Sequence, residues 1–122
     1  IIGASGTGKS SLTLKLLALG AQLVSDDRTQ LTTSGQALIA SAPSTIVGLI
    51  EARGVGILAM PTIAHTEIKF IIDLDCLTRE RLPYTKTTNL LGLNIAVIEK
   101  SETPAFAEAV FLAAKFGLSP HV

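Results

Sequence analysis

A glycine-rich segment at the start of the chain constrains the fold more than any other feature. Residues 1–10 read Ile-Ile-Gly-Ala-Ser-Gly-Thr-Gly-Lys-Ser, so two apolar residues precede the pattern G-x-x-x-x-G-K-[ST]. The leucines that follow have the spacing of a core-facing helix: Leu12, Leu14, Leu16, Leu17 and Leu19. Gly20 stands where a left-handed helix cap is expected. We therefore predict the end of a strand, a tight loop and a helix over residues 9–19.

The residue types of this loop suit the binding of phosphate groups. Gly3, Gly6 and Gly8 permit backbone conformations that a Cβ atom would block, so successive N–H groups can turn inward around phosphate oxygens. The helix that follows adds its N-terminal dipole. Lys9 would place a positive charge near the β- and γ-phosphates, and the hydroxyl of Ser10 can bind Mg²⁺. The alternative is a glycine-rich turn that binds nothing.

Two adjacent acidic residues come after the predicted helix. Residues 21–25 predict a short strand that ends in Asp26 and Asp27. Carboxylates at the carboxyl end of a strand, beside a phosphate loop, are placed for metal or proton chemistry. One could accept the proton of a hydroxyl group while the other orients Mg²⁺ or an arginine; a turn without a catalytic role is the alternative. Residues 28–41 then predict two strands joined by a tight turn at residues 34–35.

A third segment, residues 51–57, reads Glu-Ala-Arg-Gly-Val-Gly-Ile. Glu51 and Arg53 are two residues apart, so they share one side of an extended segment. Gly54 and Gly56 allow the backbone to pass close to a ligand. In the functional interpretation Glu51 binds Mg²⁺ and Arg53 pairs with a phosphate or carboxylate group. The alternative is a surface ion pair before a glycine-rich loop.

The second half of the chain predicts further elements. Residues 66–74 alternate and then become apolar, as in a strand that enters the core. Arg79, Glu80 and Arg81 form a charged loop from which an arginine could reach a phosphate. Another strand is centred on residues 93–98.

A helix is predicted at the end of the chain, with Thr103 as its N-cap and Pro104 as its first residue. It ends at Gly117. Three of its residues are expected in the core: Phe106, Val110 and Phe116. Phe111 and Leu112 leave additional apolar surface, which indicates a buried helix or a subunit contact.

The composition excludes several classes of protein. The chain has 122 residues, of which 48% are hydrophobic and 16% charged, which favours one folded domain over disorder. Ten basic residues balance ten acidic ones, so neither nucleic acid nor a membrane surface is an expected partner. The apolar runs are far shorter than the roughly 20 residues of a membrane span. The single cysteine, Cys76, excludes an internal disulfide and is expected in the core.

Three of these segments together resemble the catalytic domain of HPr kinase/phosphorylase. They are residues 3–10, residues 23–28 and residues 51–57. In that family a phosphate loop, an Asp-Asp pair and a Glu-x-Arg-Gly-x-Gly signature recur in this order. The resemblance covers roughly the first half of the chain, and the short length is similar to that of the compact proteobacterial form. It implies an α/β fold: a P-loop-containing, sheet-centred domain related to phosphoenolpyruvate carboxykinase. Residues 1–122 would form this single domain, truncated at its N-terminus.

The resemblance implies that the cofactors are ATP and Mg²⁺. The residues that would hold the nucleotide are Gly3, Ala4, Ser5, Gly6, Thr7, Gly8, Lys9, Ser10 and Arg53. Lys9 would act on the phosphates, and Ser10 with Glu51 would bind Mg²⁺. The resemblance also implies catalytic roles: Asp27 would accept the proton of a serine in phosphorylation and return it in the reverse reaction. Asp26 would support it, and Arg81 would match the family's catalytic arginine across a gap.

The implied substrate is HPr, the phosphocarrier of the sugar phosphotransferase system, or its nitrogen-branch relative. A cytoplasmic homo-oligomer, a hexamer in this family, is expected. The family's catalytic histidine lies upstream of the phosphate loop; the chain begins after that position, and neither His65 nor His121 replaces it. Ser11 stands where longer members carry an acidic residue, and a later basic loop has no counterpart. These departures favour kinase over phosphorylase activity.

Two other functions agree with the same motifs. One is a small-molecule P-loop kinase or nucleotide hydrolase, although no lid or acceptor-binding segment is recognisable. The other is a nucleotide-binding regulatory module without catalysis, which the missing histidine would explain.

Overall fold

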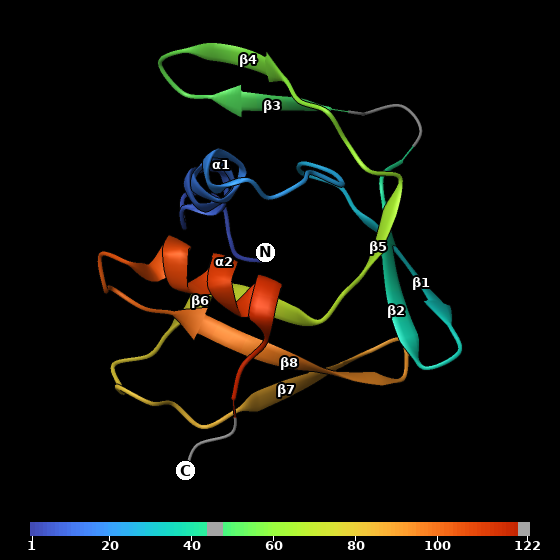
Figure 1. The fold of residues 1–122 in the computed structure, drawn as a ribbon, viewed down its shortest axis with the longest axis vertical. Coiled ribbons are helices and arrows are strands. Elements are labelled where there is room, and N and C mark those ends of the chain that lie inside the picture. The colour runs from blue at the N-terminus through green and yellow to red at the C-terminus, as the bar shows by residue number, and fades with distance from the viewer. Residues whose placement is uncertain (44–47, 120–122) are drawn as a thin grey trace. The chain divides into compact units, whose positions relative to one another are not determined.

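The structure, a computed structural model, describes residues 1–43 and 48–119. These residues form a mixed α/β protein with two helices and eight strands in three small sheets (Figure 1). The chain divides into two compact units: the described residues of the first are 1–21, 69–88 and 96–119, and those of the second are 22–43, 48–68 and 89–95. Neither described helix is long and apolar enough to cross a membrane.

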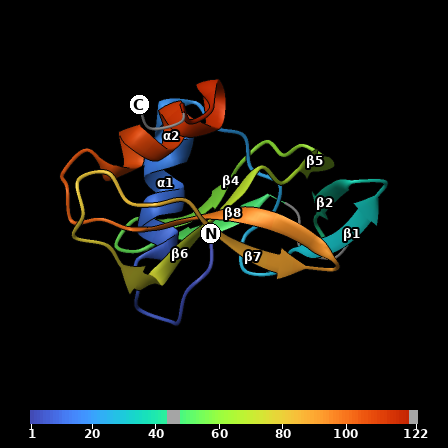
Figure 2. The ribbon, with the colours of Figure 1, turned by 90° about the horizontal axis from the view of Figure 1, so that it is seen from below.

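The first unit contains both helices and a sheet. The helices are α1 (Lys9–Leu19) and α2 (Phe106–Phe116), which lie next to each other (Figures 1 and 2). The strands of the sheet are β6 (Phe70–Leu77), β7 (Lys86–Leu90) and β8 (Leu93–Lys100). Strand β8 lies between the other two and pairs with β6 in parallel. Residues 89–95, which include the turn between β7 and β8, are assigned to the second unit.

The core of the first unit joins the two helices to β6. Its buried members are Leu12 of α1, Ile72 and Leu74 of β6, and Ala107 and Val110 of α2. Leu16, Phe70, Ile98 and Phe106 pack around this cluster. The period of two along β6 directs Ile72 and Leu74 to the same face of the strand. This core therefore packs Leu12, in the first half of α1, against β6, the strand whose backbone pairs with Ile2.

We expect Leu12→Ala to lower the free energy of unfolding by about 2–5 kcal/mol, because it leaves a cavity in this core. Leu12 is 6% exposed, whereas Leu19 on the same helix is 42% exposed. The matched variant Leu19→Ala should therefore change stability by only about 0.5 kcal/mol. Urea unfolding of the two variants measures the difference. Equal losses in both would contradict the placement of Leu12.

The first predicted helix is confirmed at both ends. It spans Lys9–Leu19, and Gly20 closes it in the left-handed conformation, with φ 112°. The N–H of Gly20 donates to the carbonyl groups of Leu16 and Leu17, which satisfies acceptors that a helix end leaves free. The expectation that Leu19 faces the core is wrong: its side chain is 42% exposed and does not belong to the core cluster.

The second helix begins two residues later than predicted. Thr103 and Pro104 precede it: the N–H of Phe106 donates to the carbonyl oxygen of Thr103 at 3.1 Å, in a turn, and Ala105 is the N-cap. Phe106 and Val110 contribute to the core as predicted. Phe116 does not, since it is 75% exposed in the last turn of α2.

The second unit is built from short antiparallel strands. They are β1 (Gln30–Ser34), β2 (Ala37–Ser41), β3 (Leu49–Ala52), β4 (Gly56–Ala59) and β5 (His65–Glu67). Strand β2 pairs with β1 and β5, and β3 pairs with β4 as a separate hairpin. The predicted β1–β2 hairpin is confirmed, but its turn lies at residues 35–36, where Gly35 has φ 61°.

Two strand predictions need correction. Residues 21–25 do not form a strand: the described backbone there makes only an isolated parallel bridge between Leu23 and Thr62. The strand predicted over residues 66–74 is interrupted, since β5 ends at Glu67 and β6 begins at Phe70. The N–H of Ile68 donates to the carbonyl oxygen of Leu38 and so continues the pairing of β5 with β2 by one residue. Strand β6 then pairs with β8 in a different sheet, so residues 66–74 are divided between two sheets.

Candidate functional site

The glycine-rich loop, residues 3–8, connects a paired backbone segment to α1. The N–H of Ile2 donates to the carbonyl oxygen of Ile72 at 2.8 Å, and the N–H of Leu74 donates to that of Ile2 at 2.9 Å. The loop therefore leaves from the edge of β6. A Cβ atom on Gly3 would lie 2.6 Å from Thr7 Oγ1, and Gly8 enters the helix with φ 100°. Both positions require glycine, so the loop geometry explains the motif.

The loop is closed by its own hydrogen bonds. The backbone N–H and the Oγ1 hydroxyl of Thr7 donate to the carbonyl oxygen of Ala4, at 3.2 and 2.7 Å. Lys9 Nζ donates to the carbonyl oxygen of Gly3, so its side chain is directed back over the loop. The predicted residues from Gly3 to Ser10 are thus one local structure, as the motif indicates.

The beginning of α1 suits an anion. Among its described residues the first turn contains no acidic side chain, and the N-cap, Gly8, provides no side-chain hydrogen bond. The first N–H groups of a helix have no partner within the helix. They attract negative charge together with the helix dipole. Ser10 is exposed in this first turn, and no residue of the described chain beyond the local backbone comes within 4 Å of the position where a Cβ on Gly6 or Gly8 would stand. The loop therefore offers donors and open space for a phosphate.

Two carboxylates that sequence reasoning missed lie within β6, those of Asp73 and Asp75. Asp75 Oδ1 accepts a hydrogen bond from the N–H of Ala4 at 2.9 Å, and Asp73 Oδ1 accepts one from the N–H of Asp75 at 2.9 Å. From the neighbouring β8, Lys100 Nζ donates to the carbonyl oxygen of Thr7 at 3.4 Å. A signal was available: the apolar run of residues 70–72 is followed by Asp-Leu-Asp, two carboxylates in a strand that otherwise belongs to the core.

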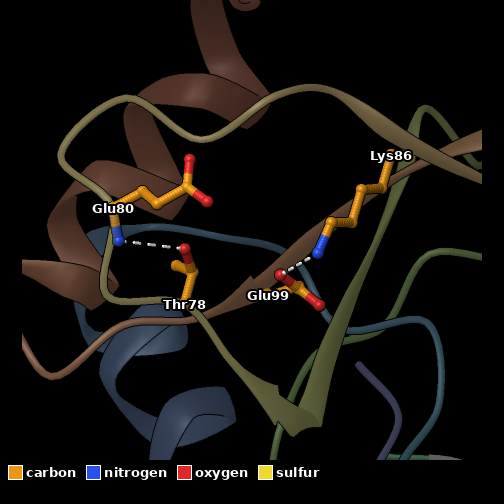
Figure 3. Close-up of polar contacts among 4 residues, drawn as sticks. All are labelled: Thr78, Glu80, Lys86 and Glu99. Atoms are coloured by element: carbon orange, nitrogen blue, oxygen red, sulfur yellow. Dashed lines mark hydrogen bonds and ion pairs between the residues drawn. The ribbon is translucent and has the colours of Figure 1, made fainter.

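Arg81 lies in the exposed segment between β6 and β7, as predicted. Figure 3 shows two polar contacts of the residues that precede and follow it in the sequence, Thr78 with Glu80 and Lys86 with Glu99. The N–H of Glu80 donates to Thr78 Oγ1 at 3.3 Å, and Lys86 Nζ forms an ion pair with Glu99 at 2.7 Å. The hydrogen bond to Glu99 raises the pKa of Lys86 above its ordinary value. Arg81 belongs to the same unit as the glycine-rich loop.

The acidic pair lies in the second unit and has an unusual backbone. Asp27 has φ 68°, and the N–H of Arg28 donates to the carbonyl oxygen of Asp26 at 2.7 Å. Asp27 is therefore the central residue of a three-residue turn, a strained conformation in which asparagine and aspartate are tolerated better than most residues. Ser25 Oγ donates to the carbonyl groups of Asp26 and Arg28. Strain of this kind is concentrated at functional sites.

Glu51 and Arg53 are also in the second unit, but they do not share one extended segment. Glu51 is exposed on β3, whereas Arg53 lies in the turn that joins β3 to β4. The N–H of Val55 donates to the carbonyl oxygen of Ala52 at 2.9 Å, and Gly54 has φ 82°. The expectation of a common side is wrong because the glycines close a hairpin turn directly after Ala52.

The predicted site residues thus divide between the two units. The glycine-rich loop, Lys9, Ser10 and Arg81 belong to the first, and Asp26, Asp27, Glu51 and Arg53 to the second. Within the described residues, no group of three or more His, Cys, Asp or Glu side chains could hold a metal ion. His65 is exposed on β5, and His121 lies outside the described residues.

Cys76 is exposed, so its prediction as a core residue is wrong. Strand β6 loses its register with β8 between Asp73 and Leu77, and the alternation that would bury Cys76 ends there. A hydrogen bond to Asp73 and the negative charge of that carboxylate raise the pKa of the Cys76 thiol.

We expect the Cys76 thiol to react with iodoacetamide at pH 8 more slowly than an ordinary exposed thiol does, because its raised pKa lowers the fraction present as thiolate. Asp73→Asn should increase the alkylation rate, since it weakens the hydrogen bond and removes the negative charge that together raise the pKa of the thiol. Glu80→Gln is the control, because Glu80 does not contribute to that shift. Mass spectrometry at timed intervals measures the rates. Equal rates in the wild type and Asp73→Asn would contradict the assigned cause.

Comparison with protein families identifies the chain. The model of the family described as HPr Serine kinase C-terminal domain matches residues 1–100. The chain belongs to this family. The resemblance inferred from the three sequence segments is therefore confirmed.

Alignments with individual members of the HPr kinase family show how much of this chain is similar to each of them. HPr kinase/phosphorylase of Exiguobacterium sp. (strain ATCC BAA-1283 / AT1b) is 39% identical in an alignment 83 residues long, which covers 62% of this chain and 27% of that protein. The Brevibacillus brevis protein of the same name is 46% identical over 63 residues, 51% of this chain and 20% of that protein. The matched part thus spans about a quarter of the length of these relatives.

A solved structure shows that the fold is shared as well. It is the Hpr(Ser) kinase/phosphatase from Coxiella burnetii, which is 28% identical and superposes with a TM-score of 0.75. The similarity covers 93% of this chain and 82% of that one. The α/β fold of this HPr kinase family member thus extends over almost the whole chain.

Proposed function

We propose that this chain is the nucleotide-binding catalytic part of an HPr kinase/phosphorylase. It would transfer the γ-phosphoryl group of ATP to a serine of the phosphocarrier HPr or of its nitrogen-branch relative. The observation that carries the proposal is the anion-binding geometry of the glycine-rich loop in a chain of this family. The proposal includes the P-loop fold related to phosphoenolpyruvate carboxykinase and a single catalytic domain formed by residues 1–122.

The glycine-rich loop would hold the phosphates of ATP. Its N–H groups and the first turn of α1 provide donors, and Lys9 is already directed over the loop by its hydrogen bond to the Gly3 carbonyl group. The Lys9 ammonium group has three donors, so it would keep this bond and direct its other N–H groups to phosphate oxygens. Arg53, exposed in the β3–β4 turn, would add a second positive charge to the nucleotide site.

Mg²⁺ would be held by Ser10 and Glu51 together with the phosphates. Mg²⁺ usually takes one or two protein oxygens and completes its shell with phosphates and water. The hydroxyl of Ser10 and the carboxylate of Glu51 are exposed oxygen donors, so their chemistry fits this ion. When bound, Mg²⁺ would neutralise charge on the phosphates.

Asp27 would act as the proton acceptor. As the serine Oγ forms its bond to the γ-phosphorus and the bond to ADP breaks, the hydroxyl proton would pass to the Asp27 carboxylate. In the reverse reaction Asp27 would return the proton to the serine oxygen. Asp26 would support this group, and Arg81 would stabilise charge on the transferred phosphoryl group.

The proposed assembly is a cytoplasmic homo-oligomer, a hexamer as the family resemblance implies. Large apolar side chains are exposed near the C-terminal end of the described chain: Leu112, Phe116 and Leu118. A group of exposed apolar side chains in one short segment is typical of a contact surface.

Label transfer tests the proposed function directly. The protein is incubated with γ-labelled ATP, Mg²⁺ and purified HPr, and with HPr whose acceptor serine is replaced by alanine. We expect label on wild-type HPr alone. Transfer to a small molecule in place of HPr would support a small-molecule kinase, and ATP binding without any transfer would support a regulatory module. Either result would contradict the proposal.

A further inference from the structure

One peptide group connects Asp75 to Lys9. The N–H of Ala4 donates to Asp75 Oδ1 at 2.9 Å, and the carbonyl oxygen of the same peptide group, that of Gly3, accepts from Lys9 Nζ. No peptide bond in the described residues is cis, so this N–H and C=O point in opposite directions in one plane. Holding the N–H toward β6 therefore directs the Gly3 carbonyl toward the Lys9 amine.

Asp75 is itself held in place by the backbone of β6. Asp73 pairs with Glu99 and Leu77 with Lys100, so β6 advances four residues while β8 advances one. Three residues of β6, 74–76, are therefore extra at this position, and such bulges redirect side chains beside functional sites. The Asp73 carboxylate accepts the N–H of Asp75 at 2.9 Å, which fixes the bulge.

The charge of Asp75 argues against a direct role as a phosphate ligand. A carboxylate repels the phosphate groups of a nucleotide, so removal of its charge alone would strengthen nucleotide binding. Its observed partner is a backbone N–H of the loop, and a hydrogen bond to an ionised acceptor is stronger than one between neutral groups. Hydrogen bonds in a chain also polarise one another. The geometry thus indicates an effect on the loop and on Lys9.

We propose that Asp75 is a positioning residue: it orients the Gly3–Ala4 peptide group and, through it, the amine of Lys9 for the phosphates of a nucleotide. This inference rests on the proposed nucleotide-binding function. The two possible effects of Asp75 have opposite signs, because loss of charge favours nucleotide binding whereas loss of positioning weakens it.

Two variants separate these effects. Asp75→Ala removes both the acceptor and the charge, and Asp75→Asn removes the charge but keeps an oxygen acceptor. We expect Asp75→Ala to weaken MgATP binding about tenfold, in line with loss of one charge-assisted hydrogen bond. Asp75→Asn should bind within about threefold of the wild type, because the retained acceptor contributes most of the positioning. Glu108→Ala, which removes an exposed carboxylate from α2, is the matched control and should bind as the wild type does.

Nuclear magnetic resonance adds a measurement that does not depend on nucleotide binding. In the nucleotide-free protein, Asp75→Ala should accelerate amide exchange at Ala4 and shift the side-chain ε-methylene signal of Lys9. The signal of Lys15, exposed on the same helix, should stay unchanged. Asp75→Asn should restore both Ala4 and Lys9 toward the wild type.

The outcomes distinguish this inference from the proposed function. Wild-type or tighter MgATP binding by Asp75→Ala, or unchanged Ala4 and Lys9 signals in that variant, would overturn the positioning role and leave the proposed function intact. Failure of the wild-type protein to bind MgATP would overturn the proposed function, and the nucleotide role of Asp75 with it.

Discussion

Replacement of Asp27 by asparagine is expected to lower the rate of phosphoryl transfer to HPr by about 10²–10⁴-fold, the usual contribution of a positioned general base. Asparagine has the size of aspartate but cannot accept the serine proton. It also tolerates the positive φ of 68° at this position, whereas alanine would add backbone strain. Asp27→Asn therefore isolates the proton-accepting role from the stability of the turn.

The variant is compared with two others in the same label-transfer assay. Asp26→Asn removes the neighbouring charge and should cause a smaller loss, because Asp26 is proposed only to support Asp27. Glu108→Gln changes an exposed carboxylate on α2 and should leave transfer unchanged. Urea unfolding of each variant checks the fold. Transfer by Asp27→Asn at the wild-type rate would show that Asp27 is not the proton acceptor.

The parts of the fold that could be predicted from the sequence are those whose own residues determine both where the element begins and where it ends. Helix α1 was predicted from end to end, because leucine periodicity and the Gly20 cap both act within the helix itself. The β1–β2 hairpin was predicted within one or two residues, since Gly35 provides the positive φ of its turn. Such signals need no information about distant parts of the chain.

Elements that depend on distant partners could not be predicted in the same way. Strand β7 contains only one large apolar residue, Leu90, and exists because it pairs with β8 at the edge of the sheet. Residues 21–25 have a strand-like composition, but Leu23 finds only a single bridge, to Thr62. In both cases the presence of a pairing strand decided the outcome: β7 forms because β8 pairs with it, whereas residues 21–25 lack such a partner strand among the described residues and do not form a strand.

The candidate site likewise has a part that could be predicted from local sequence and a part that depends on distant contacts. The residue types of the glycine-rich loop indicated phosphate binding because the motif is local. The partner of the loop did not follow from it: Asp75 contacts Ala4 across 71 residues of sequence. The bulge that directs Asp75 to the loop also exposes Cys76, and no pattern of alternation reveals a bulge. A motif therefore identified the chemistry, whereas the residues that position it required the structure.

Replacement of Lys9 by alanine is expected to lower phosphoryl transfer by about 10²–10³-fold, as for the loss of one preorganised donor to developing charge. Lys9 is the first residue of α1, where a positive charge opposes the helix dipole. Its removal relieves this unfavourable charge but also loses the hydrogen bond to the Gly3 carbonyl group, so the free energy of unfolding should change by no more than about 1 kcal/mol. A positive charge that opposes the helix dipole at this position is not needed for folding. Its place over the proposed phosphate loop indicates that function requires it.

The control for Lys9 lies on the same helix. Lys15→Ala also removes one exposed positive charge from α1, so it reproduces the change in net charge without touching the loop. We expect MgATP binding and transfer close to the wild type in Lys15→Ala, and a large loss of both in Lys9→Ala. Lys9→Arg should recover little, because a planar guanidinium does not replace a compact ammonium group. Equal activity of Lys9→Ala and Lys15→Ala would remove Lys9 from the phosphate site, because the effect would then be one of net charge alone.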